Sequence, residues 1–97
     1  MPTYISPLNF TDQGIRTVKD TPDRAQRAAE TAEKHGARFE QLYWTVGPYD
    51  IVTIIEAADD ESVTAALLEI SSWGNIRTTT LRAYNREEMS SILERLG

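Results

Sequence analysis

Two adjacent apolar runs, separated by a short turn, constrain the fold of this chain most strongly. They lie within residues 37–46 and 51–57, and the sequence Gly47-Pro48-Tyr49-Asp50 turns the chain back between them. Aromatic and β-branched residues, which favour strands, are abundant in both runs. The pattern therefore predicts a β-hairpin at the centre of a small sheet.

The rest of the sequence alternates between strand-like and helix-like segments. Thr21 and Pro22 suit the start of a helix, and Asn85 with Glu88 three residues later is an N-cap signature for a last helix. Strands are expected at 3–10, 37–46, 51–57 and 76–84, and helices at 11–19, 21–35, about 60–72 and from 85 onward. This order predicts an α+β, ferredoxin-like split βαβ fold with a four-stranded antiparallel sheet, helices over one face and an added C-terminal helix.

Both middle strands carry apolar residues on both faces, and helices on one side cannot cover both. Strict alternation predicts opposite faces for these groups: Leu42, Trp44 and Val46 against Phe39 and Tyr43, then Val52 and Ile54 against Ile51 and Ile55. Because such an exposed apolar face is unusual in a monomer, we expect a homodimer or higher homo-oligomer packed sheet to sheet. The alternative is that the C-terminal helix folds across the exposed face of its own chain. Its apolar stripe is Met89, Ile92, Leu93 and Leu96.

Composition narrows the possible partners and cofactors. The 97 residues predict one domain over 1–97, and a net charge of −5 with dispersed basic residues argues against nucleic-acid binding. No apolar run approaches the ~20 residues that cross a bilayer, and the N-terminus does not resemble a signal peptide, so we expect a cytoplasmic protein without a membrane partner. The chain has no cysteine and one histidine, His35. His35 is expected at a helix C-terminus, where a protonated imidazole is favourable, so its presence does not require a bound ligand. No metal or other cofactor is expected.

Several segments together resemble the GYD-domain family, named for its Gly, Tyr and Asp. They are Tyr43–Val52, which holds the turn, and Thr11–Ile15, Thr21–Arg24, Glu56–Asp60 and Gly74–Ala83. The resemblance implies a bacterial or archaeal stand-alone domain of the dimeric α/β-barrel group. That group includes small monooxygenases, dismutase-like enzymes and effector-binding regulatory domains, and the resemblance itself assigns no reaction. Ala58 stands where the family usually has a proline.

A few polar residues are candidates for a site. Asp50 is expected to accept hydrogen bonds from backbone amides near the turn, and Tyr49 to pack its ring with the hydroxyl at the rim. Glu56 ends an apolar strand and needs a partner if it faces inward, which Arg77 or Arg82 could provide. A carboxylate held this way could act as a general base or position a ligand. Because the two arginines are five residues apart, only one can share the face of Glu56, and Arg82 is favoured.

Two functional hypotheses follow. The first is a non-catalytic oligomeric module that binds a small organic ligand or another protein. The second is a cofactor-free enzyme that resembles the small monooxygenases. The candidate ligand-binding residues are Tyr43, Trp44, Tyr49, Asp50, Glu56, Arg77 and Arg82.

Overall fold

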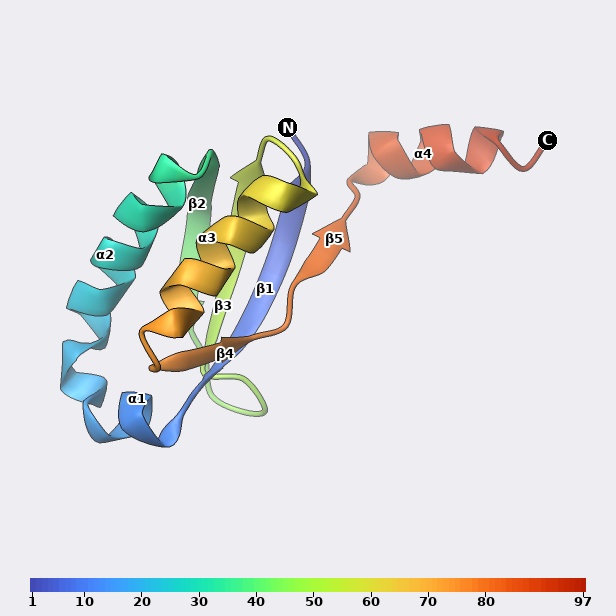
Figure 1. The fold of residues 1–97 in the computed structure, drawn as a ribbon. Helices are drawn as coiled ribbons and strands as arrows, with labels where there is room; N and C mark the ends of the chain where they lie inside the picture. Colours follow the sequence, from blue (N-terminus) through green and yellow to red (C-terminus); the bar gives the residue numbers. More distant parts are fainter.

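The computed structural model describes all 97 residues and places two long helices over one face of an antiparallel sheet (Figure 1). Its elements are β1 (Thr3–Phe10), α1 (Asp12–Arg16), the 3₁₀ turn η1 (Val18–Asp20), α2 (Thr21–Lys34), β2 (Ala37–Trp44), β3 (Ile51–Ala57), α3 (Asp60–Ser72), β4 (Ile76–Thr78), β5 (Leu81–Ala83) and α4 (Arg86–Glu94). The strand order is β2-β3-β1-β4, with β5 also paired to β1. The predicted ferredoxin-like fold is confirmed. No helix is long and apolar enough to span a bilayer.

The fourth strand is interrupted, whereas the sequence predicted one strand over 76–84. β4 and β5 follow one another along the same edge of β1 and leave Thr79 and Thr80 between them. The backbone N–H of Thr79 donates to the carbonyl of Pro7 at 2.9 Å. Pro7 has no N–H to return, so the ladder cannot continue through this position. The proline thus accounts for the break.

A β-bulge in β2 changes which side chains face the helices. The pairing with β3 skips Glu40, so that Phe39 and Leu42 both fall on the helix side and Tyr43 falls on the other. An extra residue in one strand shifts the alternation that follows it. The prediction that Phe39 and Leu42 lie on opposite faces is therefore wrong. The strand also ends at Trp44, two residues earlier than expected.

In β3 the alternation is regular and defines the two faces of the sheet. Ile51 and Ile55 are buried under the helices, while Val52 and Ile54 lie on the uncovered side. We call this second side the open face. Its apolar members are Ile5 and Pro7 of β1, Tyr43 of β2, Val52 and Ile54 of β3, and Leu81 and Ala83 of β5.

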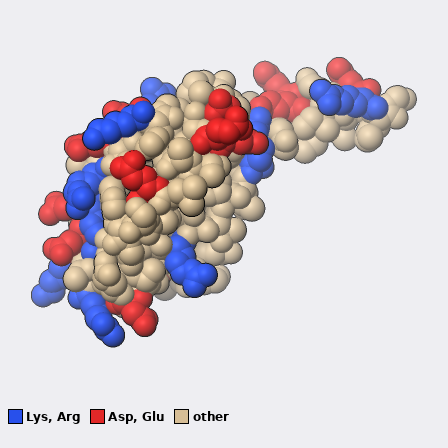
Figure 2. All heavy atoms as spheres, in the orientation of Figure 1, with Lys and Arg blue, Asp and Glu red and all other residues tan.

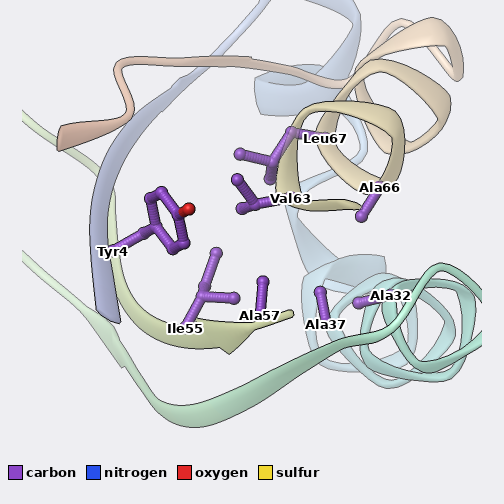
Figure 3. Packing of buried hydrophobic residues seen from close by; sticks show 8 residues of the cluster. All are labelled: Tyr4, Ala32, Ala37, Ile55, Ala57, Val63, Ala66 and Leu67. Atoms are coloured by element: carbon purple, nitrogen blue, oxygen red, sulfur yellow. The ribbon is translucent and has the colours of Figure 1, made fainter. Parts of the chain in front are cut away.

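The core lies between the helices and the inner side of the sheet (Figure 3). It consists of Tyr4, Ala32, Ala37, Ile55, Ala57, Val63, Ala66 and Leu67. The alanines let α2 and α3 approach the sheet closely. The hydroxyl of Tyr4 donates to the carboxylate of Asp60, which links β1 to the start of α3. Burial, with a smaller contribution from this hydrogen bond, raises the pKa of Tyr4 to about 12.

The short helix α1 contacts the rest of the protein through Gly14. Gly14 is buried, whereas Ile15 and Val18, which were expected to face inward, are exposed. One turn and a half of helix has only one narrow contact side, and here Gly14 occupies it against the backbone of Asn75. The cap of α2 is also shifted by one residue, since Asp20 rather than Thr21 holds the N-cap position.

The C-terminal helix α4 projects away from the body, and none of its residues is buried (Figure 1). The predicted cap is confirmed, because Asn85 and Glu88 form a reciprocal capping box. The alternative in which this helix covers the open face of its own chain is wrong. The open face remains uncovered within one chain.

Candidate functional site

Asp50 joins the loop between β2 and β3 to the end of β1. Its carboxylate Oδ2 accepts a hydrogen bond from the backbone N–H of Phe10 at 2.9 Å. Its own N–H donates to the carbonyl of Leu8 at 3.0 Å, and its carbonyl accepts from the N–H of Thr45 at 2.8 Å. The predicted role of Asp50 as an acceptor of backbone hydrogen bonds is confirmed.

The other two residues of the turn signature shape the same loop. Gly47 has a φ of +130°, a conformation that side chains disfavour, although a Cβ there would touch nothing. The carbonyl of Tyr49 accepts from the hydroxyl of Thr45 at 2.6 Å, while the side chain of Tyr49 is partly exposed. Gly47, Tyr49 and Asp50 therefore shape the loop between β2 and β3.

Replacing Asp50 with alanine is expected to lower the free energy of unfolding by about 1–3 kcal/mol, because the half-buried N–H of Phe10 loses its acceptor. Asp50→Asn keeps an oxygen at the same place and is expected to cost less than half as much. Urea unfolding of the two variants measures both values. Equal losses would show that the negative charge, rather than the acceptor, is what the loop needs.

The predicted pair of Glu56 and Arg82 does not form. Glu56 pairs with Thr3 and Arg82 with Tyr4, and neighbouring residues of a strand point to opposite faces. Glu56 is on the open face, where its Oε2 lies 3.9 Å from Nη2 of Arg38.

Arg82 instead belongs to a cluster on the helix side of the sheet, at the base of α4. Its Nη2 lies 3.5 Å from Oε2 of Glu88, and its guanidinium lies over the ring of Tyr84 at 4.5 Å. The Arg82 charge also helps to hold the pKa of Glu88 below its usual value, after the larger effect of the hydrogen bond from the backbone of Asn85.

Arg77 shares the open face with Glu56 but lies far from it. Arg77 is opposite Asn9 and Glu56 is opposite Thr3. Six residues along β1 correspond to about 20 Å. Neither arginine can therefore neutralise Glu56, and the acid–arginine site predicted from the sequence is absent.

The seven candidate residues fall into three places. Tyr43, Glu56 and Arg77 lie on the open face, Tyr49 and Asp50 in the turn, and Trp44 and Arg82 on the helix side of opposite sheet edges. The indole Nε1 of Trp44 donates to the hydroxyl of Thr21 at 3.1 Å. One chain does not gather these residues into a pocket, and their binding of a ligand stays a prediction.

Little space is left between the helices and the sheet. An apolar cavity of about 40 Å³ lies between α2, α3 and the sheet, with Leu8, Ile51, Ile70 and Trp73 in its wall. Ligand pockets typically have volumes of about 300–1,000 Å³. No group of three or more acidic or histidine side chains could hold a metal ion. The apolar open face is therefore the feature of the single chain that most needs a partner.

The centre of the open face is apolar and its margin is polar. Tyr43 and Leu81 are 55% and 51% exposed, beside the half-buried Val52 and Ile54. Arg38, Glu56 and Arg77 lie around them. An apolar centre with a charged rim is typical of protein interfaces. Leu81 is a member of this face that the sequence pattern also carries, since alternation places it opposite to Arg82.

Comparison with known proteins decides the family. A profile of the GYD domain matches residues 4–93. The chain belongs to the GYD-domain family. The resemblance seen in the sequence is thereby confirmed.

A curated relative of this GYD-domain protein is the "Glutamine synthetase and cystathionine beta-lyase binding protein" of Thermus thermophilus. It is 37% identical over 84 residues, which cover 86% of this chain and 88% of the relative. A solved structure of TTHA0845, also from Thermus thermophilus, is 25% identical, has a TM-score of 0.56, and is matched over 89% of this chain and all of that one.

Two mycobacterial regulators share the fold. A feast or famine regulatory protein of M. tuberculosis in complex with L-methionine has a TM-score of 0.67 at 19% identity, and covers 88% of this chain. The leucine response regulatory protein of Mycobacterium tuberculosis has a TM-score of 0.60 at 20% identity, over 87% of this chain. The GYD-domain protein spans about half the length of both regulators, 51% in each case.

Proposed function

We propose that residues 1–97 form a non-catalytic, homodimeric module that binds other proteins in the cytoplasm. The observation that carries the proposal is the uncovered open face. Val52 and Ile54 stand at its centre, and no helix of the same chain covers them. Sheet-to-sheet packing about a two-fold axis would remove this surface from water and bury it against an identical surface.

Two observations favour protein binding over catalysis. Glu56 and Arg82, the acid and the arginine expected to form a site, lie on opposite faces of the sheet, so they cannot act together within one chain. The apolar cavity of about 40 Å³ beneath the helices is too small for an organic substrate, and the larger hollows, of about 230 to 490 Å³, are open grooves on the surface. In addition, a relative that is 37% identical is named for its binding of two metabolic enzymes. This relationship supports a partner protein of the same kind, a cytoplasmic enzyme of amino-acid metabolism.

Binding to purified glutamine synthetase and cystathionine β-lyase from the same organism tests the proposal. In biolayer interferometry, immobilised GYD-domain protein is expected to bind at least one of them with a Kd in the micromolar range or below. An unrelated purified enzyme serves as the control. A Kd of about 100 μM corresponds to a binding free energy of only about 5.5 kcal/mol. Absence of binding to both enzymes up to that concentration would contradict this choice of partner.

A further inference from the structure

The open face carries an unbalanced negative charge at one corner, where β3 ends beside the start of β2. There Nε of Arg38 donates to Oε1 of Glu40 at 2.7 Å, and Nη2 of Arg38 lies 3.9 Å from Oε2 of Glu56. Two carboxylates therefore share one guanidinium. Glu56 is the more distant of the two and its side chain is 38% exposed, so it is free to accept a further cation.

Arg77 supplies the opposite charge at the far corner of the same face. It lies on β4 opposite Asn9, it is exposed, and its side chain makes no hydrogen bond or ion pair within the chain. In the register of the sheet, Arg77 lies two strands across and six residues along from Glu56, about 10 Å and about 20 Å. The helix side has no such separation, because acidic and basic side chains are interspersed along α2 (Figure 2).

An apolar stripe runs diagonally between these two charges. Two neighbouring cross-strand lines form it: Tyr43, Val52 and Pro7, then Ile54, Ile5 and Leu81. The first line continues to Thr79 at the β4 edge and the second to Gln41 at the β2 edge, both polar. The stripe therefore descends from Tyr43 on β2 to Leu81 on β5.

The two charges are equally distant from this diagonal stripe, on opposite sides of it. Glu56 follows Val52 by four residues in β3, whereas Arg77 precedes Leu81 by four residues along the β4–β5 edge. Both β3 and the β4–β5 edge run antiparallel to β1, so they run parallel to each other and the two displacements have opposite directions. Each displacement is about 13 Å.

We infer that two copies pack with their two-fold axis along the diagonal stripe, so that Glu56 of each copy pairs with the partner's Arg77. This inference rests on the proposed homodimer. A half-turn about a line in the interface exchanges the two sides of that line, so it places each acid over the partner's base and forms two equivalent ion pairs. The face is thus complementary to itself in charge as well as in apolar surface.

Other directions of the axis do not give this match. An axis along the strands keeps every residue at its own end of the interface, so both Glu56 side chains would gather at one end and both Arg77 side chains at the other. An axis at right angles to the strands leaves Glu56 two strands, about 10 Å, to the side of the partner's Arg77. The diagonal axis also brings Tyr43 and Leu81 against their own counterparts, which covers the two most exposed apolar side chains of the face.

Exchange of charge between the two positions tests the pairing. Glu56→Arg and Arg77→Glu each place like charges opposite one another twice in a homodimer, and each is expected to weaken dimerisation at least about tenfold in analytical ultracentrifugation. When the two variants are mixed, the heterodimer regains two pairs of opposite charge. Native mass spectrometry of the mixture is therefore expected to find heterodimers in at least about tenfold excess over either homodimer.

The double variant and a matched control complete the test. A chain with both Glu56→Arg and Arg77→Glu is expected to dimerise as tightly as the natural protein, because both pairs are restored with their signs exchanged. Glu61→Arg makes the same change of charge at the exposed start of α3, on the helix side, and is expected to leave dimerisation unchanged. Circular dichroism verifies that each variant is folded.

A random proportion of heterodimers in the mixture, or a double variant as weak as the single ones, would overturn the pairing. Light scattering on the natural protein separates this inference from the proposed homodimer. If that protein is a dimer and the mixture is random, the diagonal axis is wrong and the sheet interface remains. A monomeric natural protein removes both.

Discussion

Replacing Gly14 with alanine is expected to lower the free energy of unfolding by about 3 kcal/mol, a large part of the about 5–15 kcal/mol by which a small protein is typically stable. A Cβ on Gly14 would lie 2.0 Å from the carbonyl oxygen of Asn75. That oxygen also accepts the N–H of Thr11 at 3.0 Å, and the hydroxyl of Thr11 donates to the carbonyl of Gly74 at 2.6 Å. Because these bonds hold α1 against the loop before β4, neither side can move away cheaply.

Gly47→Ala is the matched control for this variant. Gly47 has an unusual φ but open space around it, so its replacement is expected to cost about 1–2 kcal/mol through backbone strain alone. Urea unfolding followed by circular dichroism measures both variants. If Gly14→Ala were no more destabilising than Gly47→Ala, the close approach of α1 to Asn75 would be wrong.

Replacing Val52 with aspartate is expected to convert the proposed dimer into a folded monomer. Val52 lies at the centre of the open face and is half-exposed in one chain, so a charge there is tolerated by the monomer. In the dimer the same carboxylate would be buried without a partner, which typically costs several kcal/mol. Light scattering is expected to report a fall from twice the chain mass of 10.9 kDa to that mass itself.

Leu68→Asp provides the control for the Val52 variant. Leu68 is exposed on α3, on the helix side of the sheet, and its replacement is expected to leave the dimer unchanged. Circular dichroism confirms that each variant is folded. A natural protein that is monomeric at micromolar concentration, or a Val52→Asp protein that stays dimeric, would contradict the use of the open face as the dimer interface.

The structure, and not the sequence, distinguishes the buried face of β3 from its open face. From the sequence, Ile51 and Ile55 were as good candidates for the interface as Val52 and Ile54. In the structure Ile55 is fully buried beneath the helices, so an aspartate there would unfold the monomer and reveal nothing about assembly. Alternation separates two sets of residues within a strand, but it does not say which set the helices cover.

The sequence determined the features that depend on neighbouring residues. The N-cap at Asn85 and the hydrogen-bonding role of Asp50 were both predicted, because turns and caps are made by residues a few positions apart. The order of strands and helices followed from apolar periodicity and led to the correct fold. The segments around the turn also led to the correct family.

Only the tertiary structure decided which distant residues meet. The bulge at Glu40 reversed the side on which Leu42 was expected relative to Phe39, and the pairing of β1 with both β3 and β5 separated Glu56 from Arg82. The direction of α4 likewise depends on the cluster around Arg82, whose members come from both ends of the chain. Register between strands is set by contacts summed over the whole sheet, and a shift of one residue moves every following side chain to the other face.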